Sequence, residues 1–252
     1  MVRSLTPVSG EAWKIEGEDM RTALEQLHHL STPHLADGCL RANIPIRCAP
    51  AGLGPLLPDM RCAGRARPVR HVGSVDVFFE ALREAMPGEV LVVDNGGRAD
   101  EACVGDIVAL EVAAAGLAGI VIWGLHRDSK ELSEIGFPLF SLGALPTGPQ
   151  RLTDRPPNIF SQAMIGSHSV TTSDFVVADA NGVLFLAEDR LGDIIAAAIH
   201  YRETEARQLK AMRRGHGFRS QVRFNDYLAR RTREPSYSFR QHLKDIEAAG
   251  EA

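Results

Sequence analysis

Hydrophobic and polar positions alternate along this chain with two different periods, which predicts a mixture of helices and strands. Residues 19–30, 74–85 and 191–209 place apolar side chains three or four positions apart, the spacing of one helix face. Residues 89–94 (EVLVVD) and 119–123 (GIVIW) are short, nearly continuous apolar runs, as expected of strands that are buried on both faces. Helical patterns between such strands are typical of a mixed α/β domain.

Turn and capping signals separate further elements. Ser31, Thr32 and Pro33 form a helix-start signal, because a cap candidate precedes a proline in the first turn. The Asn181-Gly182 pair lies between two apolar runs and predicts a β-hairpin. For the helix of residues 74–85, the spacing predicts a buried face made of Val75, Phe78, Phe79 and Leu82.

Residues 105–128 combine a helix, a strand and polar residues at both ends. A helix of about ten residues is roughly 15 Å long. A strand of about five residues that runs in the opposite direction is roughly 16 Å long. Asp106 and the Arg127-Asp128 pair should therefore lie at the same end of the sheet. Two carboxylates and a guanidinium could hold a divalent cation and an anionic substrate. The simpler interpretations are a helix start at Asp106 and a surface ion pair between Arg127 and Asp128.

A second candidate segment, Asn95-Gly96-Gly97, directly follows the strand of residues 89–94. Open α/β sheets place ligands at the carboxyl ends of their strands. Glycines allow backbone N–H groups to approach an anion such as a substrate carboxylate. A plain tight turn is the alternative.

Composition limits the class of protein. The chain has 252 residues, of which 44% are hydrophobic, and this suits one globular domain with an appendage. A net charge of −4 argues against nucleic-acid binding through bulk charge. We expect a cytoplasmic protein without a signal peptide or membrane span, because no apolar leader or long apolar run is present. Four cysteines without metal-ligand spacing are expected to be reduced thiols: Cys39, Cys48, Cys62 and Cys103.

Residues 211–252 differ from the rest in charge. They carry nine Lys or Arg and five acidic residues, a balance of +4 that leaves the first 210 residues at −8. Aromatic residues are interleaved with the basic ones. Basic and aromatic residues together are compatible with RNA binding. The favoured interpretation is a helical arm that packs on a neighbouring subunit through its aromatic residues.

The motif formed by Asp106, twenty intervening residues and Arg127-Asp128 resembles the D-x20-R-D signature of a known family. This family comprises the class II pyruvate aldolases related to the regulator of ribonuclease activity A. The segments STPHLADGCLR, LPDMRCAGRARPV, GEVLVVDNGG, GFPLFSLG and SDFVVADANGV extend the resemblance over residues 30–205. The resemblance implies a family domain over residues 1–210 and a tail over residues 211–252. It also implies a layered α/β/β/α sandwich similar to the swivelling phosphohistidine domain, assembled as trimers or hexamers.

The resemblance also implies an activity, the cleavage of 4-hydroxy-4-methyl-2-oxoglutarate to pyruvate with Mg²⁺ or Mn²⁺, and a possible oxaloacetate decarboxylation. In this interpretation Asp128 is the direct metal ligand, and Asp106 holds a water of the metal and assists proton transfer. Arg127 contacts the keto or enolate oxygen. Backbone at Asn95, Gly96 and Gly97, and further toward Asp106, seats the pyruvyl carboxylate.

An acidic residue of the long helix at residues 191–209 is implied to reach a neighbouring subunit's site. Glu203 is the first choice and Glu205 the second, and a solvated helix face is the alternative. The family also contains proteins that bind and inhibit a ribonuclease, and these tend to lack the acid found here as Asp106. A sugar-acid lyase or dehydratase on the same scaffold is a further alternative. One departure is Thr172-Ser173-Asp174, where the family usually has Pro-Gly-Asp.

Overall fold

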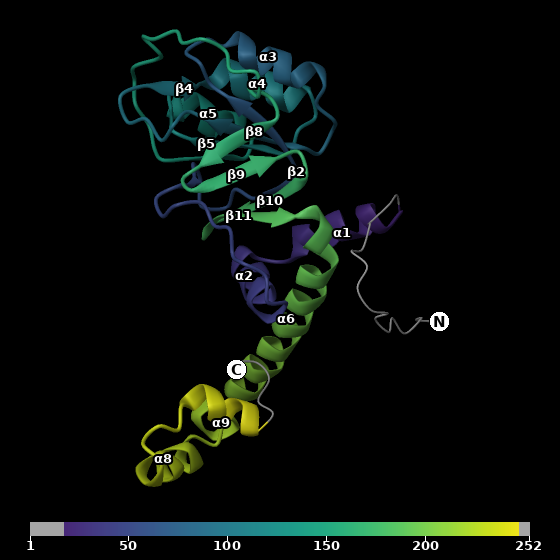
Figure 1. Ribbon diagram of the computed structural model, residues 1–252, viewed down its shortest axis with the longest axis vertical. Helices are drawn as coiled ribbons and strands as arrows, with labels where there is room; N and C mark the ends of the chain where they lie inside the picture. Colours follow the sequence, from purple (N-terminus) through teal and green to yellow (C-terminus); the bar gives the residue numbers. More distant parts are fainter. Residues whose placement is uncertain (1–17, 247–252) are drawn as a thin grey trace.

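The computed structural model describes residues 18–246 and has one curled seven-stranded sheet at its centre (Figure 1). Neighbouring strands follow the order β1-β7-β5-β3-β2-β10-β11. The strands β2, β3, β5 and β7 run parallel, whereas β1, β10 and β11 each pair antiparallel to a neighbour. The strands are β1 Gly54–Pro55, β2 Cys62–Arg70, β3 Val90–Asp94, β5 Gly119–Trp123, β7 Leu139–Ser141, β10 Asp174–Asp179 and β11 Gly182–Ala187.

Strand β2 is the joint about which the sheet curls. Its first residues, 62–65, pair with β10, and its last residues, 66–70, pair with β3. The two halves of the sheet face each other across an apolar layer that includes Val92, Phe140, Val176 and Phe185. The hairpin formed by β8 (Gln162–Ile165) and β9 (His168–Thr171) contributes to the same layer.

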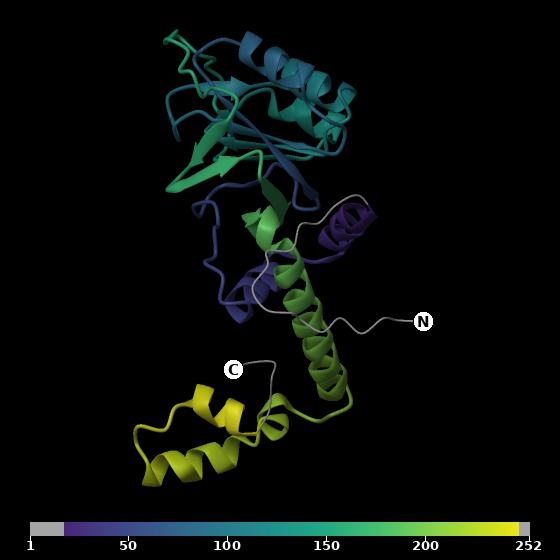
Figure 2. The same ribbon diagram turned by 45° about the vertical axis from the view of Figure 1, so that its right-hand side comes forward.

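Helices cover the two outer faces. One face packs against α3 (Asp76–Arg83), α4 (Asp106–Ala114) and α5 (Ser129–Ile135). The face of β10 and β11 packs against α1 (Glu18–His29), α2 (Thr32–Arg41) and α6 (Leu191–Arg213), as Figure 2 also shows. The expected mixed α/β fold is confirmed, in the form of one curled sheet with helices on both sides. The likeness to the swivelling phosphohistidine domain stays a prediction.

Several local expectations are confirmed. Ser31 caps α2, because its hydroxyl accepts a hydrogen bond from the His34 N–H. Strand β3 is buried along its whole length. Strands β10 and β11 form the expected hairpin, in which Asp179 pairs with Gly182. The four cysteines are free thiols.

The predicted face of α3 is half right, because Phe78 is buried and Leu82 packs partly buried against the same core, but two of its residues are wrong. Val75 and Phe79 are 45% and 41% exposed, and the buried residues are Val77, Phe78 and Ala81. Phe78 belongs to both the predicted and the observed buried face, and its ring stacks on the His71 ring at a centroid distance of 5.4 Å. The smaller Val77 and Ala81 allow the helix to approach the sheet closely, which hydrophobicity alone does not indicate.

Helix α6 leaves the domain as a long rod (Figures 1 and 2). Its first turns are buried through Leu191, Ile194, Ile195 and Ala198. Beyond these turns the helix is largely exposed. At its far end lie α7 (Phe218–Gln221), α8 (Phe224–Arg233) and α9 (Phe239–Asp245), which pack around Tyr227, Tyr237 and Leu243.

The division into residues 1–210 and 211–252 stays a prediction. Helix α6 runs through residue 210 and ends at Arg213. The first 17 and the last six residues of these two predicted regions lie outside the described part. Within residues 18–246, the structure contains no helix with the length and apolar character needed to cross a bilayer.

Candidate active site

The start of α4 and the turn after β6 lie against each other. Strand β4 (Ala102–Val104) pairs with β6 (Leu125–His126), and this short pairing brings their following residues together. Gly105 packs on the Asp128 carboxylate so closely that a Cβ on Gly105 would overlap Asp128 Oδ2. The same Cβ would lie 3.3 Å from Arg127 Nε. Asp106 follows Gly105 directly, so the structure brings the three motif residues into one region.

Asp128 has an unusual backbone conformation. Its φ of 62° and ψ of 41° lie in the left-handed region, which is unfavourable for a residue with a Cβ. Two backbone hydrogen bonds hold the chain around it. The Arg127 N–H donates to the Val104 carbonyl at 2.9 Å, and the Leu132 N–H donates to the Asp128 carbonyl at 2.9 Å. The turn is therefore tied to β4 on one side and to α5 on the other.

The charged groups of this region are open to ligands. The side chains of Arg127 and Asp128 are 48% and 33% exposed, and Arg127 Nε lies 3.3 Å from Asp128 Oδ2. Asp106 is half-buried in the first turn of α4, where a negative charge is favourable, and its Oδ1 accepts from the Ile107 N–H at 2.7 Å. Gly148 lies over the Arg127 guanidinium, since a Cβ there would be 2.8 Å from Nη1.

The site fits a magnesium ion held by few protein ligands. The accessible Asp128 carboxylate rests in a cradle at Gly105 that a side chain would fill. Among residues 18–246, the structure contains no cluster of three or more His, Cys, Asp or Glu side chains with metal-binding geometry. Mg²⁺ commonly binds one or two carboxylates and keeps several waters, and Mn²⁺ accepts similar oxygen ligands. One chain therefore offers one carboxylate, that of Asp128, and leaves the other positions around a metal ion to water or substrate.

The Asn95-Gly96-Gly97 segment follows β3, as expected, but its N–H groups already have acceptors. The Asn95 and Gly97 N–H groups donate to the Trp123 carbonyl at 3.1 and 3.0 Å. The Gly96 N–H donates to Asp94 Oδ1 at 2.8 Å. These three donors are therefore not free for a substrate carboxylate. The first turn of α4 has N–H groups without backbone acceptors inside the helix, although that of Ile107 donates to Asp106 Oδ1, and it becomes the better candidate.

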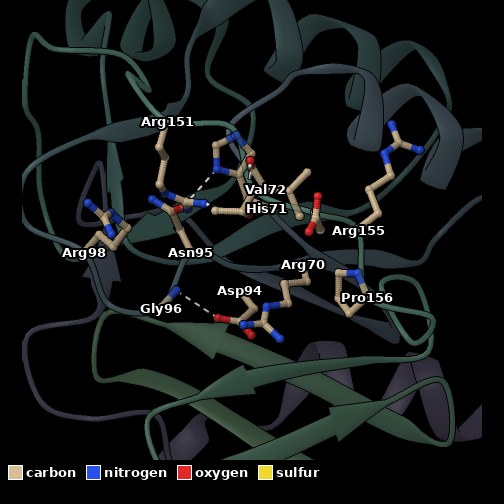
Figure 3. A pocket seen from close by; sticks show the side chains of 12 residues that line it. Arg70, His71, Val72, Asp94, Asn95, Gly96, Arg98, Arg151, Arg155 and Pro156 are labelled. Atoms are coloured by element: carbon tan, nitrogen blue, oxygen red, sulfur yellow. Dashed lines mark hydrogen bonds between the residues drawn. The ribbon is translucent and has the colours of Figure 1, made fainter.

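A cavity of about 620 Å³ opens beside this segment, at the ends of β2 and β3 (Figure 3). Asn95 and Gly96 line it together with the side chains of Arg70, Arg98, Arg151 and Arg155. Arg70 has no ion pair with any residue in the described part of the chain. Asp106, Arg127 and Asp128 do not line the cavity. The two regions are linked by one loop, because Gly148 contacts Arg127 and Arg151 bonds to Asn95.

A buried polar network forms one wall of the cavity. Arg151 Nη2 lies 3.0 Å from Asn95 Oδ1 and 2.9 Å from Glu101 Oε1. His71 Nδ1 lies 2.9 Å from the same Asn95 oxygen, as Figure 3 shows. Burial lowers the pKa of His71, although the bond to Asn95 opposes this change. Sequence reasoning missed His71, Glu101 and Arg151, since single polar residues outside a motif carry no signal until the fold joins them.

Glu203 and Glu205 lie on α6, which leaves the side of the domain remote from α4 (Figure 1). Neither residue can join Asp106 and Asp128 within one chain. Glu205 is engaged locally, because its Oε2 lies 3.0 Å from His34 Nε2. Glu203 is exposed and has no hydrogen bond or ion pair to another residue of the described chain. Of the two predicted acids, Glu203 is the one available to a second molecule.

Comparison with known proteins identifies the family. The profile of the family described as RraA-like, Aldolase/RraA, matches residues 32–185, which is more than half of the chain. The 4-hydroxy-4-methyl-2-oxoglutarate aldolase of Thermus thermophilus is 31% identical over 132 residues, covering 52% of this chain and 79% of that protein. Protein DlpA of Legionella pneumophila is 25% identical over 208 residues, which are 80% of this chain but 33% of DlpA.

A solved structure agrees with this assignment. Streptomyces coelicolor RraAS2, described as an unusual member of the RNase ES inhibitor RraA protein family, superposes with a TM-score of 0.64 at 25% identity. The match covers 76% of this chain and 98% of that one. Fold, family profile and relatives thus agree, and the chain belongs to the Aldolase/RraA family.

Proposed function

We propose that this protein is a divalent-metal-dependent lyase that cleaves a 4-hydroxy-2-oxo acid, such as 4-hydroxy-4-methyl-2-oxoglutarate, to release pyruvate. The observation that carries the proposal is the packing of Arg127 and Asp128 on Gly105, next to Asp106. This arrangement joins an accessible carboxylate, a guanidinium and a second carboxylate. The aldolase named among the relatives supports the same chemistry.

The reaction needs a proton acceptor and a stabilised oxyanion. The proton leaves the 4-hydroxyl group, the C3–C4 bond breaks, and its electron pair forms the enolate of pyruvate. A magnesium ion held by Asp128 would supply Lewis-acid stabilisation of the 2-oxo oxygen. Arg127 provides a fixed cation at the same oxygen. Asp106 assists the proton transfer, including the later protonation of C3.

The pyruvyl carboxylate and the distal part of the substrate bind to different parts of the protein. The N–H groups of the first turn of α4 seat the pyruvyl carboxylate, because the helix gives them no backbone acceptor and they lie at its positive end. The Ile107 N–H, which donates to Asp106 Oδ1, would exchange that acceptor for the substrate. The arginine-lined cavity beside Asn95 has room for the distal part of the substrate. Arg70 is a cation there without an ion pair to the described residues. Asp94 and Asp154 also line the cavity, so a second carboxylate of the substrate would bind at Arg70 rather than across the whole cavity.

The active form is a homo-oligomer, a trimer or a hexamer, in which Glu203 completes a neighbouring site. The second half of α6 supports this, since Leu209 and Met212 are exposed there. Residues 211–252 carry a charge of +4 and the rest carries −8, so the tail complements the acidic domain of a second copy. The tail is thus proposed as an oligomerisation arm.

The direct test is pyruvate release from 4-hydroxy-4-methyl-2-oxoglutarate by the purified full chain, with Mg²⁺ and with a chelator. We expect turnover only with the metal. Asp128→Ala should abolish the turnover. Lys130→Ala should keep it, because Lys130 is an exposed residue at the start of α5, two positions after Asp128. A folded, magnesium-loaded protein without turnover on this acid or on oxaloacetate would contradict the proposal.

The similarity to RraAS2, a member of a ribonuclease-inhibitor family, favours one alternative, a non-catalytic binding protein. Asp106 argues for the lyase, because the ribonuclease-binding members of the family tend to lack an acid at this position. Capture of a ribonuclease by the full chain, together with an inactive lyase assay, would favour the alternative.

A further inference from the structure

The residue before the Arg127-Asp128 pair is a buried histidine whose ring bonds to two different elements. His126 ends β6 and is 4% exposed. Its Nδ1 lies 2.7 Å from Ser141 Oγ, at the end of β7. Its Nε2 lies 2.9 Å from Ser129 Oγ, in the first residue of α5. The ring therefore joins β6, β7 and α5.

Both bonds can exist with a neutral ring. A neutral imidazole donates from one nitrogen and accepts at the other, and a serine hydroxyl takes either role. Ser141 also accepts the Gly143 N–H at 3.1 Å, which anchors the loop that passes over Arg127. The histidine is thus the centre of a clamp made of three side chains, His126, Ser129 and Ser141.

Asp128 lies inside this clamp, between His126 and Ser129. Its left-handed backbone lies in a region that residues with a Cβ rarely occupy, although aspartate enters it more often than most. Such a conformation persists only where the surroundings determine it. The bond from His126 to Ser129 joins the residues on either side of the Arg127-Asp128 pair, and so fixes the two ends of the turn. Without this bond, only the backbone bonds from Arg127 to Val104 and from Leu132 to Asp128 would hold the turn.

We propose that His126 is a positioning residue that, through Ser129, holds the Asp128 carboxylate in the orientation used for the divalent metal. The metal part of this inference rests on the proposed function. The positioning part rests on the hydrogen bonds and on the backbone of Asp128 alone. Groups that orient a ligand in this way commonly change metal affinity by about 10-fold to 100-fold when they are removed.

The experiment measures Mn²⁺ affinity by electron paramagnetic resonance on metal-free full-length protein. Ser129→Ala removes one hydroxyl and should weaken Mn²⁺ binding by about tenfold or more. Ser129→Thr keeps a hydroxyl and should restore most of the affinity. Ser133→Ala is the matched control, because Ser133 lies on the same helix and donates to the Ser129 carbonyl without contacting His126. His126→Gln, which cannot reach both serines, should resemble Ser129→Ala.

A second measurement separates positioning from metal binding. Crystal structures of metal-free wild-type protein and Ser129→Ala should differ at Asp128, with the left-handed backbone kept only in the wild type. If wild-type protein binds no Mn²⁺, the proposed function fails, but the crystal comparison still decides the positioning role. A folded Ser129→Ala variant with an unchanged Asp128 and Mn²⁺ affinity within twofold of wild type would overturn the inference.

Discussion

The Asp128 carboxylate and the residue at position 105 compete for the same space, which only a glycine leaves free. Asp128 carries its carboxylate on a backbone conformation that its neighbours must maintain. Gly105 is required for a different reason, because its φ of −130° is open to any residue. What excludes a side chain there is the carboxylate itself, which occupies the space of a Cβ. Neither constraint could be derived from the sequence, which shows only a helix start and an Arg-Asp pair.

This packing predicts the effect of adding one methyl group. Gly105→Ala should displace the Asp128 carboxylate and weaken Mn²⁺ binding by about tenfold or more, as loss of a ligand-orienting contact does. The global fold should survive, since the displaced groups are partly exposed. Calorimetric titration with Mn²⁺ checks this prediction. Gly217→Ala is the control, because a Cβ there meets no atom within 4 Å. Equal affinities for the two variants would refute the packing argument.

At the scale of elements, long apolar patterns were predictable and short pairings were not. The β3 and α4–β5 segments follow from buried runs and from the lengths of helix and strand. Strands β4 and β6, with three and two residues, are too short to give a pattern, and yet they align Gly105 with Asp128. The cavity network joins residues up to 80 positions apart, because His71 and Arg151 both bond to Asn95, so only the closed fold reveals it.

One contact between distant elements carries a testable stability effect. Asp179, at the end of β10, accepts hydrogen bonds from the Thr32 N–H at 2.8 Å and from its hydroxyl at 2.7 Å. These bonds tie the start of α2 to the sheet. Asp179→Asn should lower the free energy of unfolding by about 2 kcal/mol, typical for hydrogen bonds to a charged group. Urea denaturation at neutral pH checks the change.

The same contact predicts a pH dependence. Burial raises the pKa of Asp179, but the bonds from Thr32 and Asn181 outweigh burial and hold the pKa below its ordinary value. The folded state thus favours the carboxylate. Its stabilisation is present above the ordinary pKa of about 3.9 and is lost as the pH falls through the lower folded value. The difference between wild type and Asp179→Asn should therefore shrink in acid. A constant difference from neutral pH down to acid would contradict this assignment.

At the scale of the whole molecule, the separation between Glu203 and Asp128 is the feature that needs explanation. Helix α6, which carries Glu203, leaves the domain on the side remote from α5, which directly follows Asp128 (Figure 1). A shared site in a trimer or hexamer would remove this separation. The sequence predicts a helix over residues 191–209 but not that its second half projects from the domain, because the exposed half continues the periodicity of the buried half.

A shared site predicts complementation between inactive variants. Asp128→Ala and Glu203→Gln should each be inactive as pure oligomers. Co-assembled subunits should regain part of the pyruvate-releasing activity, because some sites then take Asp128 from one chain and Glu203 from another. Activity assays on co-expressed, differently tagged chains check this. Mixed oligomers as inactive as their parents, with subunit exchange verified, would rule out the shared site.

The most direct test of the central claim does not depend on the physiological substrate. A metal-dependent site for the pyruvate enolate should exchange the methyl protons of pyruvate with deuterium from D₂O, which proton NMR follows over time. We predict rapid exchange by wild-type protein with Mg²⁺, and background rates with a chelator or with Asp128→Ala. Background exchange by folded, oligomeric wild-type protein with saturating Mg²⁺ and pyruvate would contradict the enolate site.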